Sequence, residues 1–147
     1  QEHRTLWLFS QYGFGLGAVV TASGFVLLAS AKSAGSNPLA GLASYGMLIG
    51  ALLWGINLVL RATDAEGFAA GTHPRWPFLV YTLLTMLGLA VWGWLYLQGD
   101  FPTWLGWATL VPIVTLFLVL IFLRDMPPFV YYVITLPTVW VLFSQTP

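Results

Sequence analysis

Long apolar runs without a charged residue constrain this chain more than any other feature of its sequence. Five such runs, separated by short segments rich in turn-forming residues, cover positions 6–31, 39–60, 77–98, 104–123 and 129–143. A helix needs roughly 20 residues to cross the ~30 Å hydrocarbon core of a bilayer, and the first four runs reach that length. Because lipid offers no hydrogen-bond partners, each run must satisfy its own backbone groups, which an α-helix does.

The fifth run is shorter than the others and has Pro137 within it. We expect a short or kinked span there, with a re-entrant segment as the alternative. Asn37 and Pro38 come before the second run, and Thr103 comes before the fourth. These residue types are common at helix starts. The sequence therefore predicts an all-α integral membrane protein, a single transmembrane domain built as a five-helix bundle.

The composition agrees with a bilayer as the solvent of this chain. Hydrophobic residues make up 59% of the 147 residues and charged residues 7%, where soluble domains carry about 25% charged residues. The net charge is zero and there is no basic run, so nucleic-acid binding is not expected. The absence of cysteine excludes disulfides and thiolate metal sites. The first residue is Gln1, which leaves room for native residues, or a further helix, beyond either end.

The distribution of charges predicts an orientation in the membrane. Five spans bring the N-terminus and the segments 61–76 and 124–128 to one side. Four arginines fall on that side, and Lys32 falls on the other. The four are Arg4, Arg61, Arg75 and Arg124. Short loops rich in arginine and lysine stay in the cytoplasm. We therefore expect a multi-pass protein of the cell (inner) membrane with its N-terminus cytoplasmic and its C-terminus outside.

Tryptophans support these span boundaries, because amphipathic indole rings collect at the level of the lipid headgroups. Trp7 and Trp76 are expected at the inner interface. The outer interface is expected to hold Trp92, Trp94, Trp104, Trp107 and Trp140. Trp54 is the exception, since it lies about two turns inside the second span.

Small residues recur at a spacing of four in the first two spans. Gly13 and Gly17 follow Tyr12 in the same pattern in which Gly46 and Gly50 follow Tyr45. Such spacing lets two helix backbones approach closely in lipid. We interpret these glycines as the packing faces of a tight helical hairpin, with a dimerisation or partner-docking face as the alternative.

The second span also has a polar line on the face that continues from these glycines. Trp54, Asn57 and Arg61 follow Gly50 at spacings of four, three and four, which places them on one helix face. A buried amide such as that of Asn57 needs a partner, most often on a neighbouring helix. The alternative is a contact to a bound lipid, pigment or cofactor. The candidate contact residues are Trp54, Asn57, Arg61, Tyr81 and Thr85, and no motif identifies a particular cofactor.

The longest polar segment, 61–76, is expected to form a short interfacial helix that dips Phe68 into the headgroups. His3 and His73 lack the spacing of a metal-ligand motif, so no metal site is expected. The sequence contains no catalytic set or phosphate loop, and no charged residue lies near the centre of a span. We therefore expect neither an enzyme nor an ion pump.

These observations favour a small accessory or structural subunit of a larger membrane complex. Such a subunit would pack through its glycine-rich helix faces against other membrane subunits and contact lipid or pigment. The alternative function is a stand-alone binder or transporter of an apolar small molecule. Its site would be the pocket predicted around Trp54 and Asn57.

Overall fold

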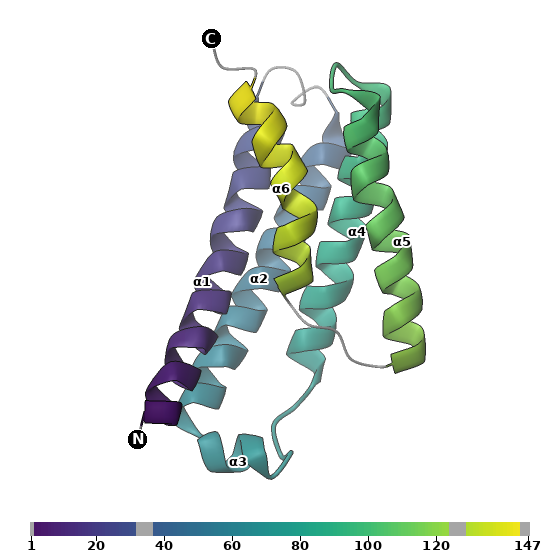
Figure 1. Ribbon diagram of the computed structural model, residues 1–147. Coiled ribbons are helices and arrows are strands. Elements are labelled where there is room, and N and C mark those ends of the chain that lie inside the picture. The colour runs from purple at the N-terminus through teal and green to yellow at the C-terminus, as the bar shows by residue number, and fades with distance from the viewer. Residues whose placement is uncertain (1, 32–36, 124–128, 145–147) are drawn as a thin grey trace.

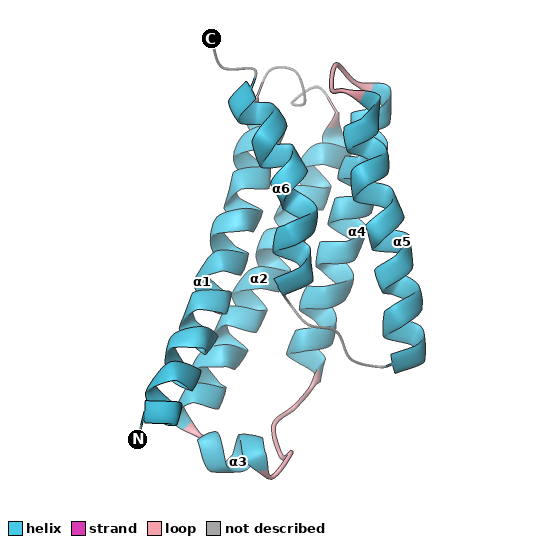
Figure 2. Cartoon of the chain, in the orientation of Figure 1, coloured by secondary structure: helices cyan, strands magenta, loops and turns pink. Residues whose placement is uncertain are grey.

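The computed structural model describes residues 2–31, 37–123 and 129–144, with the side chains of 2–4 and 123 excluded. Within these residues the chain is helical and has no strand (Figure 2). The helices are α1 (Glu2–Ser30), α2 (Pro38–Thr63), α3 (Ala65–Ala69), α4 (Trp76–Gln98), α5 (Thr103–Leu123) and α6 (Phe129–Ser144). The expected all-α class is confirmed, and the helix bounds follow the predicted runs closely.

Four of these helices, α1, α2, α4 and α5, are long and apolar enough to cross a membrane. The fifth apolar helix, α6, has 16 residues and is therefore about 24 Å long. It fits beside the other four, with Pro137 inside it as predicted. Together these helices make the chain a candidate multi-pass membrane protein.

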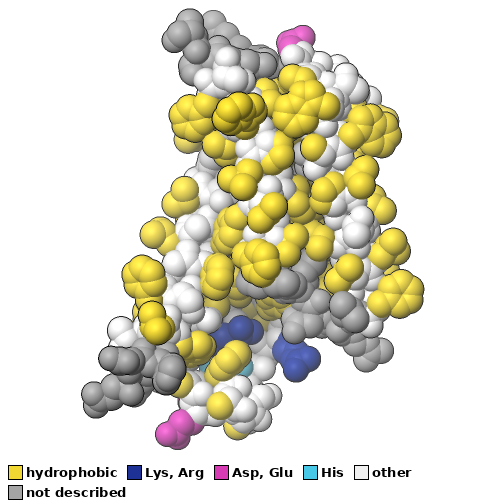
Figure 3. All heavy atoms as spheres, viewed as in Figure 1, with side chains coloured by type: hydrophobic (Ala, Val, Ile, Leu, Met, Phe, Trp, Pro, Cys, Tyr) yellow, Lys and Arg dark blue, Asp and Glu magenta, His cyan; other side chains and the backbone are white. Residues whose placement is uncertain are grey.

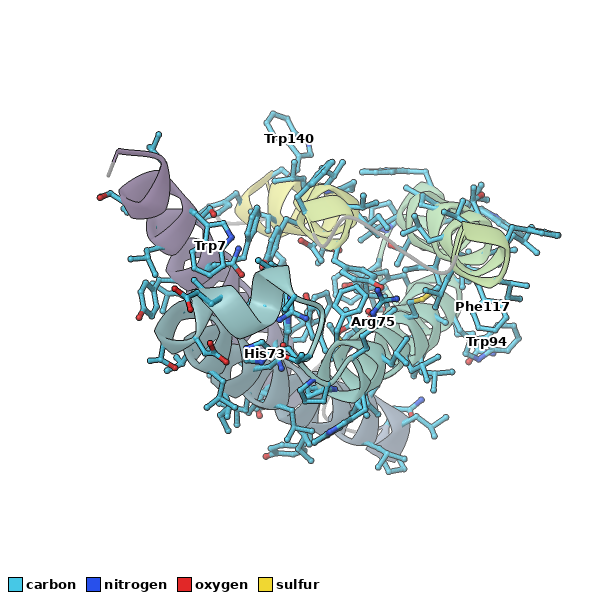
Figure 4. The ribbon with its side chains drawn as sticks, turned by 90° about the horizontal axis from the view of Figure 1, so that it is seen from below. Trp7, His73, Arg75, Trp94, Phe117 and Trp140 are labelled. Carbon is cyan, nitrogen blue, oxygen red and sulfur yellow. The ribbon has the colours of Figure 1, made fainter. Side chains whose placement is uncertain are left out.

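The helices pack as a bundle in which α1 contacts α2, α2 contacts α4, and α4 contacts α5. The helix α6 lies between α1 and α5 and completes the ring (Figures 1 and 4). It begins well short of the end of the bundle at which α1 starts. We call that end, which also carries α3, the α3 end, and the opposite end the far end. The interior is therefore flanked by α6 only in its far part.

Local sequence explains most of the helix ends. The side chain of Asn37 accepts a hydrogen bond from the Leu39 N–H at 3.0 Å, and Pro38 is the first residue of α2, as predicted. The cap predicted at Thr103 is wrong, because α5 already includes Thr103. Its preceding carbonyl, that of Pro102, accepts a hydrogen bond from the Leu105 N–H.

A short helix does form in the predicted polar segment. The carboxylate of Asp64 accepts a hydrogen bond from the Gly67 N–H at 3.0 Å and so caps α3. The chain then turns toward α4 at Gly71, whose φ of 71° is a left-handed conformation that glycine adopts without a Cβ clash. This turn sets His73 and Arg75 immediately before α4.

The far half of the core is organised around Ser44. The Trp92 indole N–H donates to the Ser44 hydroxyl oxygen at 3.0 Å, and the Ser44 hydroxyl lies within hydrogen-bond distance of the carbonyls of Phe25 (3.0 Å) and Ala40 (2.7 Å). Phe25 also packs its ring on Trp92, with the centroids 5.5 Å apart. Three helices thus meet at one hydroxyl. Trp92 is 1% exposed, so its ring belongs to the core, and its predicted depth near the outer interface stays a prediction.

The other tryptophans predicted near that interface do have exposed side chains. They are Trp94, Trp104, Trp107 and Trp140. Seen along the bundle, Trp94 and Trp140 point away from the ring of helices, as does Phe117 (Figure 4). The outer surface of the described helices is covered by hydrophobic side chains (Figure 3). Such a surface suits a lipid environment.

Candidate functional site

The described charged side chains gather at the α3 end. Arg61 lies in the last turn of α2. Asp64 and Glu66 lie at the start of α3, and His73 and Arg75 precede α4. Asp100 is the described exception, since it follows α4 at the far end. The clustering expected from the sequence is therefore present among the described residues, although the side of the membrane on which it lies remains a prediction.

Phe68 ties α3 to its neighbours. Its ring lies 5.9 Å from that of Trp7 in α1 and 6.3 Å from that of His73. The guanidinium carbon of Arg61 lies 4.9 Å from the centre of the Phe68 ring, within the range of a cation–π contact. Phe68 therefore packs on the protein at the α3 end, with 37% of its surface exposed.

Trp54 packs between α2 and α4. Its ring stacks on Tyr81 at 4.4 Å with 19° between the ring planes, and Phe78 meets it edge-on at 6.1 Å. Tyr81 in turn meets the ring of Tyr131 from α6 edge-on at 5.8 Å. The predicted neighbours Trp54 and Tyr81 are thus brought together. Both are 2% exposed, so they are core residues in this arrangement.

The polar atoms of this α2 line lack hydrogen-bond partners. Neither the nitrogen nor the oxygen of the Asn57 amide has a partner among the described residues, although Asn57 is 2% exposed. The indole N–H of Trp54 and the Nε of Arg61 are also buried without partners. The interhelical hydrogen bond expected of Asn57 is therefore absent from the described structure. An unpaired buried amide is costly, by about 1–3 kcal/mol.

The antiparallel pairing of α2 and α4 places Asn57 along the bundle. Gly50 lies against Tyr81, and one turn later Trp54 lies against Phe78. One turn toward the end of α2 is therefore matched by one turn toward the start of α4. The next turn of α2, which carries Asn57 on the same face, therefore comes level with the first turn of α4.

A separate polar cluster lies deeper in the bundle. Hydroxyl side chains from α1, α4 and α6 converge on a cavity of about 10 Å³, room for about one water molecule. They are Thr21, Tyr81, Thr85, Tyr131, Tyr132 and Thr135. Of the predicted contact residues, Tyr81 and Thr85 line this cavity. Trp54, Asn57 and Arg61 do not line this cavity.

The predicted glycine hairpin is partly wrong. The helices α1 and α2 do pack together, but Gly46 and Gly50 face Leu84 of α4, and Gly17 faces Tyr132 of α6. Gly13 has nothing within 4 Å of where a Cβ would stand. The close approach between α1 and α2 occurs at Gly15, where an added Cβ would stand 3.7 Å from the Cα of Gly55. Three of the four glycines thus pack against helices, but not against each other.

Sequence reasoning missed the glycines with the least space. A Cβ on Gly106 would stand 2.9 Å from the Gly93 carbonyl oxygen, between α5 and α4. A Cβ on Gly88 would collide with Met47 and lie 3.1 Å from the Ala43 carbonyl oxygen. Gly88 therefore sets the distance between α2 and α4, and Gly106 sets the distance between α4 and α5. The only signal in the sequence was glycine inside a long apolar run, since glycine in a helix costs about 1 kcal/mol relative to alanine and so calls for a packing reason.

Two apolar grooves flank α6. One has a volume of about 250 Å³, between α1 and α6. Its lining is Val20, Thr21, Gly24, Phe25, Thr135, Thr138, Val139 and Leu142. The other, of about 720 Å³, is wider and lies between α6 and Trp104 of α5. We call them the α1–α6 groove and the α5–α6 groove.

The described residues contain no group of three or more histidine, cysteine or acidic side chains that could hold a metal ion. The expected absence of enzymatic activity is not tested by this geometry. Comparison with protein-family models, curated proteins and solved structures found no match to this chain.

Proposed function

We propose that this chain is a small accessory subunit of a larger membrane complex, and that a transmembrane helix of another subunit docks in the α1–α6 groove. The observation that carries the proposal is the floor of this groove. Gly24 has no described atom within 4 Å of where its Cβ would stand, so the backbone of α1 is open to close approach at that point. Small residues at an open helix surface are a recurrent feature of helix–helix contacts in lipid.

The polar groups of the groove favour a helix over an acyl chain as its occupant. Thr21, Thr135 and Thr138 belong to the lining of an otherwise apolar surface. Hydroxyl groups hydrogen-bond to small polar residues or carbonyls of a neighbouring helix, whereas a lipid tail offers them nothing. Thr138 accepts a hydrogen bond from the Tyr96 hydroxyl at 3.3 Å.

Native sizing tests this proposal. Gly24→Leu fills the groove without striking the described neighbours of Gly24, and Gly41→Leu is its matched control, because Gly41 in α2 also has nothing within 4 Å. We expect the wild type and Gly41→Leu, extracted in mild detergent, to migrate as a complex, and Gly24→Leu to migrate as the single chain. A wild type that runs alone, or loss of the complex in both variants equally, would overturn the proposal.

Cross-linking identifies the occupant, since the chain has no cysteine of its own. A thiol introduced as Gly24→Cys should cross-link to a different membrane protein, whereas Leu27→Cys, 72% exposed on α1, should give much less product. Cross-linking of Gly24→Cys only to a second copy of this chain would make the occupant the chain itself, and no product would favour lipid. Both results contradict docking of another subunit.

We also propose that α6 is a fifth span and that the α3 end faces the cytoplasm. The arginines at the ends of the predicted spans support this orientation, and α1 begins at the opposite end of the bundle from that at which α6 ends (Figure 1). Reporters fused before Gln1 and after Pro147 should respond from opposite sides of the membrane. A response from the same side would mean that the chain crosses the membrane an even number of times, and would contradict five spans.

The alternative, a stand-alone binder or transporter of an apolar small molecule, ranks second. The cavity inside the bundle has room for about one water molecule, so an apolar ligand would have to use the grooves outside it. The α5–α6 groove is lined by Trp104, Trp140 and Phe143 and suits a flat lipid or pigment ring. Pigment or lipid that co-purifies with a monodisperse monomer would favour this alternative.

A further inference from the structure

We infer a binding site for a phosphate group at the α3 end, formed by Arg61, Arg75 and the first turn of α4, with the Asn57 amide as its deepest polar group. The site is separate from the α1–α6 groove and does not depend on the proposed docking. The shared ligand chemistry is an anionic phosphate, carried by a lipid headgroup or present as free phosphate.

The two arginines carry positive charge that no described carboxylate neutralises. Arg61 lies in the last turn of α2 and Arg75 directly precedes α4, the two helix ends that the antiparallel pairing brings level, and no described acid lies within 4 Å of either guanidinium. The nearest acid in sequence, Asp64, accepts the Gly67 N–H and lies 3.4 Å from the His73 ring nitrogen. Two arginines held together without a counter-charge form a favourable environment for an anion.

The start of α4 adds to this positive field. The helix has 23 residues, and Arg75, its N-cap residue, makes no side-chain hydrogen bond to the first turn. The second residue is Pro77, which has no N–H to donate. The remaining first-turn amides and the helix dipole favour a negatively charged group at this end.

Asn57 is an independent sign of a ligand. Its amide is buried, has no partner among the described residues, and comes level with the first turn of α4 through the antiparallel pairing of Gly50 with Tyr81 and Trp54 with Phe78. By this register Asn57 lies beside the helix start at which the anion is proposed. An amide nitrogen can donate to a phosphate oxygen, which would compensate the loss of its hydration.

The short α6 leaves this site open from the side. On the face shown in Figure 3, the dark-blue atoms of the described arginines are visible between α3 and the helices above it. Seen from the α3 end, Arg75 lies toward the middle of the ring of helices (Figure 4). Arg61 is in the last turn of α2, where a span meets the headgroup region. A lipid phosphate can therefore reach the arginines laterally.

Lipid retention tests the inference in the purified full chain. The protein in detergent is mixed with equal amounts of phosphatidylglycerol, whose phosphate charge is uncompensated, and phosphatidylcholine, whose phosphate is neutralised by its own quaternary ammonium, and bound lipid is counted by native mass spectrometry. We expect preferential retention of phosphatidylglycerol, reduced about fivefold by Arg61→Gln or Arg75→Gln. Lys32→Gln, which removes one positive charge from the segment joining α1 to α2, is the matched control and should retain the wild-type ratio.

Asn57→Leu separates a ligand contact from a purely structural role. It removes an unpaired buried amide, so the lipid-free protein should melt no lower than the wild type, while retention of phosphatidylglycerol should fall. Arg75 is exposed, so its replacement leaves the packing intact and gives a second reading if Asn57→Leu alters the fold.

A second arm distinguishes the sources of the phosphate. If free phosphate is the ligand, inorganic phosphate should raise the melting temperature above that in chloride at equal ionic strength, and Arg75→Gln should abolish the increase without any lipid preference. The inference is overturned if neither phosphate source is preferred, or if both arginine variants behave like Lys32→Gln.

Discussion

The hydroxyl of Tyr132 in α6 donates a 2.6 Å hydrogen bond to the Phe14 carbonyl oxygen in α1, and its ring lies over Gly17. A carbonyl oxygen inside a helix already accepts a hydrogen bond from its own helix, so the Tyr132 hydroxyl donates to the second lone pair of the Phe14 oxygen. The absence of a side chain at Gly17 is what allows the tyrosine ring to come this close. One tyrosine and one glycine therefore hold α6 to α1 on the α3 side of the α1–α6 groove.

Tyr132→Phe should weaken this attachment. It removes the hydrogen bond and keeps the ring, so we expect a loss of roughly 0.6 kcal/mol, and at most ~1.7 kcal/mol, the range for interhelical bonds in lipid. The measurement is the free energy of unfolding in detergent. Tyr45→Phe, on an exposed tyrosine of α2, should change it little, and an equal loss in both variants would argue against a specific role of the bond.

Ser44→Ala should be more damaging than its size suggests. It leaves the Trp92 indole N–H without its acceptor in a fully buried place, and an unpaired donor of this kind costs about 1–3 kcal/mol. Thermal unfolding should show the loss, whereas Ser30→Ala, on an exposed serine bonded to its own helix, should not. Adding Trp92→Phe to Ser44→Ala should cost less than the sum of the two single changes, because the donor is then absent; additive losses would refute the coupling.

Gly50→Leu should disrupt the packing of α2 against α4. A Cβ at position 50 would stand 3.2 Å from the Cα of Tyr81, so the helices must separate, and overpacking of this kind typically costs about 1–3 kcal/mol. Gly41→Leu on the same helix, where nothing lies within 4 Å, is the control. Unchanged melting of Gly50→Leu in detergent would contradict the packing described for this face.

Gly106→Ala tests the approach of α5 to α4 with the smallest addition available. The new methyl group would meet the Gly93 carbonyl oxygen at 2.9 Å, a backbone atom that cannot turn aside. We expect a lower melting temperature, and no decrease for Gly24→Ala, whose methyl group enters open space. A higher melting temperature of Gly106→Ala would contradict this close approach. It would mean that the helix preference of alanine, about 1 kcal/mol relative to glycine, outweighs any clash.

The helices were predictable from sequence, whereas the faces they use were not. Length, hydropathy and turn residues locate each helix to within a few residues, because lipid leaves the backbone no alternative to internal hydrogen bonds. Contacts between helices lack this simple rule, because a lipid-facing and a protein-facing surface are both apolar. Trp92 illustrates the difficulty: its position near a helix end is typical of the interface, and nothing in the sequence shows that its N–H meets Ser44 and its ring packs on Phe25 in the core.

The candidate site shows the same division. The line of Trp54, Asn57 and Arg61 follows from helix geometry and is present in the structure. Its pairing with the start of α4, which brings Arg61 and Arg75 to adjoining helix ends, depends on how two helices slide past one another. That register is set by close contacts such as Gly88 against Met47, and glycines alone do not name their partners.

The short α6 has a consequence for the surrounding bilayer. A helix of about 24 Å beside neighbours that match or exceed a ~30 Å hydrocarbon core leaves a local mismatch. Where α6 crosses with them, the leaflet next to its start must thin or its headgroups must sink toward the protein. The chain would thus gather deformed lipid on one flank and be enriched in thinner regions of the membrane.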